Sequence, residues 1–216
     1  MLDATYQMLE WFFKEINLNT RNNEDMARRI FIAIDISEQA RRRVSDFTEQ
    51  LKKEFSHLRG GWEKPEKLHL TLKFLGDADE VQLEKLKEIV ENIAAKISKF
   101  TLRIAETGVF PSARNARVLW IDVKDEKGSA AKINQSLETE CEKIGFAKEK
   151  RNFKPHLTIA RVRDVGKSRE LAESHLKKEF EPVEFEVAEI VIYESRLQPT
   201  GSIYTNVFSS KLKAES

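Results

Sequence analysis

A short motif with two chemically active side chains occurs twice in the sequence. Residues 69–72 read His-Leu-Thr-Leu and residues 156–159 read His-Leu-Thr-Ile, each inside a run of strand-forming residues. From ordinary residue frequencies, a second copy would arise by chance on the order of one per cent of the time. The repeat therefore indicates two equivalent halves of one site.

Strand geometry predicts how each motif presents its side chains. Successive residues of a strand point to opposite faces, so His69 and Thr71 share one face. Leu70 and Leu72 are expected on the other face, together with Phe74. His156 and Thr158 are related in the same way, so each motif offers an imidazole beside a hydroxyl.

This pair of groups suits the cleavage of a phosphodiester. In-line displacement at phosphorus needs a base at the attacking oxygen and an acid at the departing oxygen. Two histidines, with an ordinary pKa of about 6.5, can supply one neutral and one protonated imidazole near neutral pH. The pattern predicts His69 and His156 as the catalytic acid and base. Thr71 and Thr158 are predicted to donate hydrogen bonds to the phosphate oxygens.

A zinc site is the competing interpretation of paired histidines. Structural zinc needs four ligands and catalytic zinc usually needs three, and no further ligand lies at a suitable spacing. His57 and His175 fall in charged, helical segments, and Cys141 is the only cysteine. The sequence therefore predicts no metal and no cofactor, and it does not favour Cys141 as a nucleophile.

The composition narrows the functional class further. The 37 Lys and Arg residues nearly cancel the 36 Asp and Glu residues, so no overall positive field indicates nucleic acid or a membrane surface. No apolar run is long enough to span a bilayer, and a single cysteine favours a reducing compartment. We expect a cytoplasmic protein in which any charge that binds phosphate is local.

The order of the predicted elements indicates an α+β fold. Strands are expected at 29–34, 68–75, 100–109, 116–123, 155–162, 183–193 and 202–211, and helices at 38–55, 79–97, 128–144 and 167–178. Ser37 is the expected N-cap of the first of these helices. Residues 1–25 are predicted to form an N-terminal extension, with a short amphipathic helix. Residues 26–212 are predicted to form the main domain.

The sequence resembles the 2H phosphoesterases, and within them the LigT-like RNA 2′,3′-cyclic phosphodiesterases, also called 2′-5′ RNA ligases. The resemblance covers about residues 26–212. Its motifs are residues 29–35 (RIFIAID), Trp62 with 67–76 (KLHLTLKFLG), 108–111 (GVFP) with 116–120 (ARVLW), 154–161 (KPHLTIAR), and 193–197 (YESRL) with Gly201 and Tyr204.

The resemblance implies a bilobal fold of two pseudo-symmetric lobes, each with an antiparallel sheet flanked by helices. One motif would lie in each lobe, and the two motifs would face each other across a cleft. It further implies opening of 2′,3′-cyclic phosphates at RNA ends to 2′-phosphomonoesters without a metal, with 2′-5′ ligation as a second activity. RNA ends are the implied partner, and we expect a monomer with no membrane association.

The same resemblance suggests further site residues. His69 would protonate the departing 3′ oxygen and His156 would activate water. Arg161 matches an arginine near the substrate. Regular alternation, however, turns its side chain to the strand face away from His156, unless the strand ends or bulges first. Phe31 and Trp62 are candidates for stacking on a base, but an aromatic residue in an apolar strand such as Phe31 is more often part of the core.

Two other functions fit the same residues. The chain could be a module that binds RNA ends or nucleotides with vestigial catalysis, although both motifs are intact. Alternatively, the chemistry could act on small cyclic nucleotide phosphates. A basic run at Lys150, Arg151 and Lys154, ahead of the second motif, is where an RNA backbone could bind.

Overall fold

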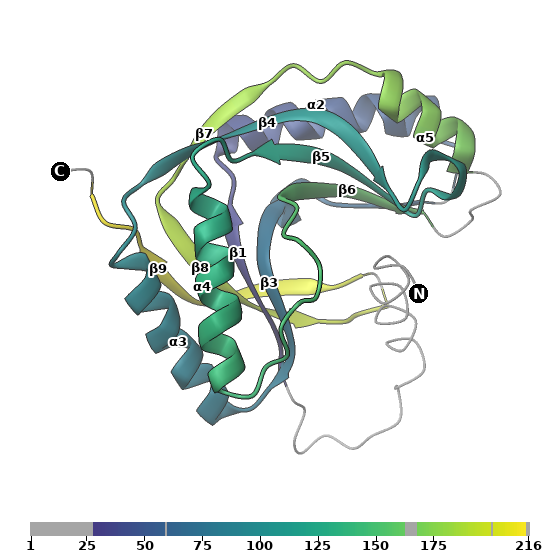
Figure 1. Cartoon of the computed structure of the whole chain (residues 1–216). Coiled ribbons are helices and arrows are strands. Elements are labelled where there is room, and N and C mark those ends of the chain that lie inside the picture. The colour runs from purple at the N-terminus through teal and green to yellow at the C-terminus, as the bar shows by residue number, and fades with distance from the viewer. Residues whose placement is uncertain (1–27, 59, 163–167, 200, 215–216) are drawn as a thin grey trace.

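The protein folds into two antiparallel sheets, which a computed structural model describes for residues 28–58, 60–162, 168–199 and 201–214 (Figure 1). The first sheet has the strand order β3-β1-β8-β9, and the second has the order β2-β6-β5-β4-β7. The predicted α+β class is confirmed. The strands are β1 Arg28–Asp35, β2 Gly60–Trp62, β3 His69–Ala78, β4 Phe100–Phe110, β5 Val118–Lys124, β6 His156–Val162, β7 Val183–Val187, β8 Glu189–Arg196 and β9 Ile203–Lys211.

Helices cover the outer face of each sheet, and two of them cross between the sheets (Figure 1). α2 follows β1 of the first sheet but packs with α5 on the second sheet. α4 follows β5 of the second sheet but packs with α3 on the first sheet. The bounds are α2 Glu38–Glu54, α3 Glu80–Ala94, α4 Ser129–Lys143 and α5 Ser168–Lys177, with 3-10 turns at η2 Pro65–Lys67 and η3 Ala113–Asn115.

The core lies between each sheet and its helices. Ile30, Ile32 and Ile34 alternate along β1 and are at most 2% exposed. Because strand side chains alternate, the residues between these isoleucines point to the opposite, inner face of the first sheet. These residues, Phe31 and Ala33, are 3% and 0% exposed, so β1 is buried on its inner face as well.

The two motif strands lie at or near the edges of their sheets. β3 is an edge strand of the first sheet. β6 is the second strand of its sheet, next to the short edge strand β2. β3 and β6 are in contact with each other although they belong to different sheets. The fold thus brings the two copies of the motif together.

Local signals in the sequence fix the starts of two helices. Ser37 caps α2 as predicted, and its hydroxyl accepts a hydrogen bond from the backbone N–H of Ala40 at 3.2 Å. Asp79 caps α3 in a capping box, in which Gln82 reciprocates the hydrogen bond. These contacts satisfy backbone N–H groups that have no partner within the helix.

The structure differs from the predicted elements in two places. The predicted strand at 183–193 divides at Ala188 into β7 and β8. β7 pairs with β4 of the second sheet, and β8 pairs with β1 of the first sheet. The short strand β2, which pairs with β6, was not predicted. The predicted N-terminal extension, residues 1–25, lies outside the described residues. Within the described part of the chain, no helix is both long enough and apolar enough to cross a membrane.

Candidate active site

The first motif is built on the pairing of β3 with β1. Asp35 lies opposite His69 and Phe31 lies opposite Phe74, on the same inner face as Thr71. The prediction that Phe74 faces away from His69 is wrong. The register shifts at Leu72, which has no partner on β1, and this bulge returns Phe74 to the inner face.

The second motif repeats this arrangement on β6 and β5. Asp122 lies opposite His156, and Trp120 lies opposite Thr158. A register shift leaves Ile159 as an extra residue, so that Arg161 lies on the same face as His156. The bulge resolves the open question about Arg161, because a regular strand would have turned its side chain away from the motif.

Hydrogen bonds orient both catalytic candidates identically. The Nδ1–H of His69 donates to the carbonyl of Lys67 at 2.7 Å, and the Nδ1–H of His156 donates to the carbonyl of Lys154 at 2.7 Å. A carbonyl oxygen can only accept, so Nδ1 carries the proton in each neutral ring. Nε2 is therefore the nitrogen of each neutral ring that carries no proton and can accept one. Nε2 of His69 lies 3.0 Å from the hydroxyl oxygen of Thr71, which donates to it.

The environment favours the neutral form of both imidazoles. Burial, with smaller contributions from Arg161 and His156, lowers the pKa of His69 to about 4, although the Lys67 carbonyl and Asp35 oppose the shift. Burial, Arg161 and Lys154 also lower the pKa of His156. Because Arg161 acts on both rings, its guanidinium lies within electrostatic reach of both motifs.

Arg41, in a helix that packs on the second sheet, binds the segment that leads into the first motif. Arg41 of α2 donates through Nη1 to the carbonyls of Pro65 and Leu68, the latter at 3.3 Å. Its Nη2 also lies 3.5 Å from the carbonyl of Ile36, at the end of β1. These bonds fix the backbone that supplies the carbonyl partner of His69.

An aromatic cluster surrounds the first motif. The ring of Phe31 lies 4.9 Å from His69 and 5.3 Å from Tyr193, and Tyr204 packs edge-on against His69 at 5.5 Å. Phe31 is only 3% exposed, which leaves little surface for a base and makes it a support for His69. Phe74, on the same face, is 44% exposed.

The remaining predicted aromatic residue lies on the other sheet. Trp62 pairs with Ala160 across β2 and β6, and it packs half-buried against the core. It therefore lies beside the second motif strand. A stacking role for Trp62 stays a prediction.

Lysines at equivalent positions flank the two motifs. Lys67 and Lys154 each precede a motif histidine by two residues. The ammonium of Lys154 lies 4.2 Å from the ring centroid of Trp120, and that of Lys67 lies 5.7 Å from the ring centroid of Tyr204. Cation–π contact of this kind holds a positive charge in place without neutralising it.

Gly108 makes room for the indole ring of Trp120, which lies beside the second motif. It lies opposite Trp120, and a Cβ at this position would come 2.1 Å from the indole ring. The ring centroids of Trp120 and His156 are 6.0 Å apart. Gly108→Ala is expected to lower the free energy of unfolding by about 1–3 kcal/mol and to reduce activity, because the indole must move. Denaturant unfolding measures the first effect. Gly61→Ala, whose Cβ would meet nothing closer than 3.4 Å, is the control; equal stability of the two variants would contradict this account.

The other histidines and the cysteine have different surroundings. His175 is fully buried, and its Nε2–H is shared between the carbonyls of Gly108 and Trp120, each at 3.1 Å. His57 is exposed. Burial raises the pKa of the Cys141 thiol to about 12, which suppresses the nucleophilic thiolate. Across the described residues, no group of three or more His, Cys, Asp or Glu side chains could hold a metal ion.

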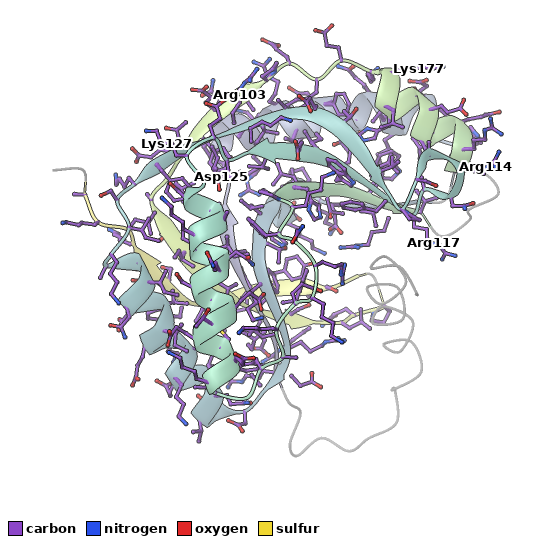
Figure 2. The ribbon with its side chains drawn as sticks, in the orientation of Figure 1. Arg103, Arg114, Arg117, Asp125, Lys127 and Lys177 are labelled. Atoms are coloured by element: carbon purple, nitrogen blue, oxygen red, sulfur yellow. The ribbon has the colours of Figure 1, made fainter. Side chains whose placement is uncertain are left out.

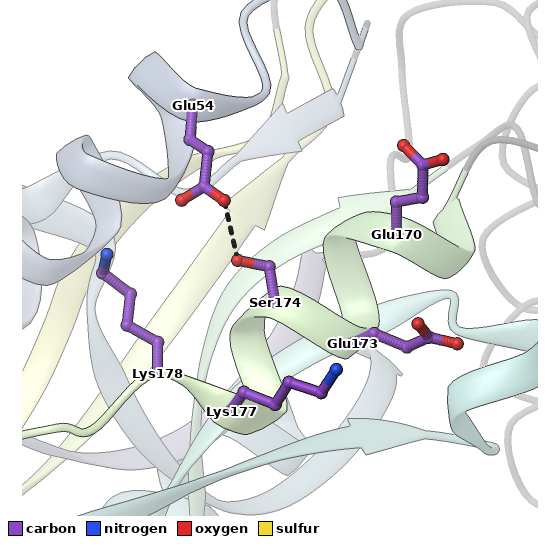
Figure 3. A pocket seen from close by; sticks show the side chains of 6 residues that line it. All are labelled: Glu54, Glu170, Glu173, Ser174, Lys177 and Lys178. Carbon is purple, nitrogen blue, oxygen red and sulfur yellow. Dashed lines mark hydrogen bonds between the residues drawn. The ribbon is translucent and has the colours of Figure 1, made fainter.

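A surface hollow between α2 and α5 is a poor alternative site. Three carboxylates and two ammonium groups line it, and its one internal hydrogen bond joins Ser174 to Glu54 at 3.0 Å (Figure 3). None of its residues belongs to a motif strand or lies opposite one. The hollow lacks the paired acid and base that the motifs supply.

Charged side chains are spread over the outside of the second sheet, as Figure 2 shows. Arg114 and Arg117 lie at the turn between β4 and β5, and Arg103 and Lys127 lie toward the opposite end of that sheet. This distribution agrees with the balanced overall charge. Positive charge at the site comes from local groups, chiefly Arg161 and Lys154.

Two carboxylates that lie opposite the motif histidines are not predicted from the sequence. Asp35 and Asp122 occupy equivalent positions, and both end an Ile-Asp pair within a buried strand. The Asp35 carboxylate also accepts hydrogen bonds from the Tyr193 hydroxyl at 2.8 and 2.9 Å. The repeated dipeptide was the available signal, but it is too short to stand out before the strand pairing is known.

Comparison with known proteins agrees with this geometry. The family described as LigT like Phosphoesterase matches residues 34–120 and 121–204, one match for each motif. The chain is 35% identical over 185 residues to an RNA 2′,3′-cyclic phosphodiesterase of Methanothermobacter thermautotrophicus, covering 84% of this chain and 97% of the relative. A protein of the same name from Methanocaldococcus jannaschii is 36% identical over 177 residues, covering 82% and 96%.

Solved structures show the same fold. The protein TT0787 of Thermus thermophilus superposes with a TM-score of 0.72 at 25% identity, covering 87% of this chain and all 100% of that chain. LigT of E. coli in its apo form superposes with a TM-score of 0.68 at 22% identity, covering 87% and 99%. With two lobes, two motifs and matches over most of its length, this chain belongs to the LigT-like phosphoesterase family.

Proposed function

We propose that this phosphoesterase opens 2′,3′-cyclic phosphates at RNA ends to 2′-phosphomonoesters, with His69 and His156 as acid and base. The observation that carries the proposal is the pair of imidazoles on two contacting strands, each with Nδ1–H bound to a carbonyl and Nε2 left as the reactive atom. The names of the two relatives described above support the choice of substrate.

The chemistry follows from two Nε2 atoms that share one proton. Nε2 of His156 removes a proton from water as the water oxygen bonds to phosphorus. The bond from phosphorus to the 3′ oxygen breaks, and the protonated Nε2 of His69 donates its proton to that oxygen. The product carries a 2′-phosphate and a free 3′-hydroxyl. A proton moves from His156 to solvent and another from solvent to His69 before the next turnover.

The remaining groups hold the charged phosphate. The hydroxyls of Thr71 and Thr158 and the guanidinium of Arg161 lie on the motif faces, where they can donate to the non-bridging oxygens. With a 5′-hydroxyl in place of water, the same attack would form a 2′-5′ linkage, which we include as a secondary activity.

Comparing substrates of different length tests the proposal against its alternatives. An RNA oligonucleotide and a mononucleotide, each ending in a 2′,3′-cyclic phosphate, are incubated with the protein in the presence of a chelator. Turnover of the oligonucleotide with the higher kcat/KM supports an enzyme for RNA ends. Preference for the mononucleotide would favour small cyclic nucleotide phosphates, and tight, salt-sensitive binding without product would favour a binding module.

The lowered pKa values predict an acidic optimum for kcat/KM. The active free enzyme has one protonated and one neutral imidazole, a state that is most populated between the two pKa values of the pair. Since burial and Arg161 hold the pKa of both rings below 6.5, the bell-shaped profile of kcat/KM should peak below pH 6.5 and decline toward pH 8. The profile of kcat should lie at higher pH, because bound phosphate stabilises the imidazolium. Rates measured from pH 4 to 9 at constant ionic strength decide this; an optimum of kcat/KM above pH 7 would refute it.

A further inference from the structure

The connection between α4 and β6, residues 145–155, determines where His156 lies. It has no regular secondary structure, and it leads past β3 into the catalytic strand (Figure 1). It also supplies the Lys154 carbonyl that holds Nδ1 of His156. A segment without secondary structure needs other contacts to be held at the accuracy that catalysis requires.

A buried ion pair between β3 and α4 supplies such contacts. Nζ of Lys73 lies 2.5 Å from Oε2 of Glu138, and the two side chains are 2% and 14% exposed. Lys73 follows the first motif directly. The bulge at Leu72 places Lys73 opposite Ile32, on the outer face of the sheet beneath α4.

Both members of the pair also bind the connection. Nζ of Lys73 donates to the carbonyl of Ala147 at 3.1 Å, and Oε2 of Glu138 accepts from the backbone N–H of Glu149 at 3.0 Å. Asn134 of α4 donates to the carbonyl of Leu72 at 2.8 Å, which ties the helix to the bulge itself. The strand of the first motif is thus bonded to the segment that enters the second.

Fold stability alone does not account for this pair. Desolvating two charges offsets most of their attraction, so that apolar replacements of a buried ion pair are often neutral or stabilising. In the equivalent position of β6, opposite Leu119, the chain has the small residue Ala160. The fold therefore accepts an uncharged residue at this position of a motif strand.

We infer that Lys73 and Glu138 are positioning residues, which hold the 145–155 connection so that His156 stands in register with His69. The pair acts through the backbone and touches no reacting atom. The inference rests on the proposed function, because it assigns the pair a role in the reaction of that same site.

The test replaces the pair with apolar residues of similar size, Lys73→Met with Glu138→Leu. The expected result is a denaturation midpoint close to that of the unaltered protein, with kcat reduced about 10- to 100-fold. The Nδ1–H proton signal of His156 in nuclear magnetic resonance spectra should exchange faster with water, while that of His69 is unchanged. Lys143→Met with Glu140→Leu removes an exposed pair on the same helix and should alter none of these quantities.

A single conservative variant keeps the test decisive if the double apolar variant does not fold. Glu138→Gln keeps an oxygen that can accept from Glu149 and Lys73, so it should retain more activity than Glu138→Leu. A double apolar variant with kcat within twofold of the unaltered protein and an unchanged His156 signal would overturn the inference. So would equal activity of the Gln and Leu variants. If the unaltered protein opened no cyclic phosphate, the proposed function would fail, whereas the His156 signal would still decide whether the pair positions that ring.

Discussion

Replacing either motif histidine with alanine is expected to lower kcat for opening of a cyclic phosphate by about 10²–10⁴-fold, the usual contribution of a general acid or base. Each variant removes one of the two Nε2 atoms that must share the proton. KM should change much less, because Arg161 and the two threonines still bind the phosphate. Steady-state kinetics of His69→Ala and His156→Ala measure both parameters.

The double variant and an exposed histidine complete this experiment. Because the two rings act as a unit, the double variant should lose little more activity than the worse single variant. His57→Ala removes an exposed histidine away from the motifs and should leave kcat unchanged. Retention of more than a tenth of the activity by either motif variant would mean that its imidazole is neither acid nor base.

Replacing Arg161 with methionine should have the next largest effect. Loss of a charged donor to the phosphate is expected to reduce kcat/KM by about 10²–10³-fold. Arg161 lowers the pKa of both His69 and His156, so its removal should also move the kcat/KM profile toward higher pH. Kinetics over a range of pH test both parts of this prediction.

Two further arginine variants separate charge from geometry. Arg161→Lys keeps the positive charge but loses the planar pair of donors, so it should shift the pH profile less than methionine while still lowering the rate. Arg103→Met removes an exposed arginine at the far end of the second sheet and should behave like the unaltered protein. An Arg161→Met enzyme with normal kcat/KM and an unshifted profile would show that the guanidinium is structural, held by Glu63 at 3.6 Å.

Local sequence patterns were sufficient to single out the two motif histidines and to predict most of the elements. His69 and His156 stood out because two identical tripeptides in strand-like runs are rare. The fold then brings the two motifs together through the contact of β3 with β6. Ser37 was found from helix-capping preferences, which depend on a few neighbouring residues. Such features are encoded within one turn or one strand.

Features that depend on a partner strand were harder to predict. Phe74 was assigned to the wrong face and Arg161 was left open, because a bulge depends on the register with the neighbouring strand. Both residues follow a motif histidine by five positions, so the two bulges obey the same pseudo-symmetry as the motifs. Ala188, where the chain changes sheets, carries no local signal for that change.

Product analysis of one reaction tests the central claim most directly. An RNA oligonucleotide ending in a 2′,3′-cyclic phosphate is incubated with the protein and excess chelator, and the position of the phosphate in the product is determined. Paired histidine catalysis with departure of the 3′ oxygen predicts a 2′-phosphomonoester alone, formed at the same rate with and without chelator. A 3′-phosphomonoester, no turnover, or loss of turnover with chelator would contradict it.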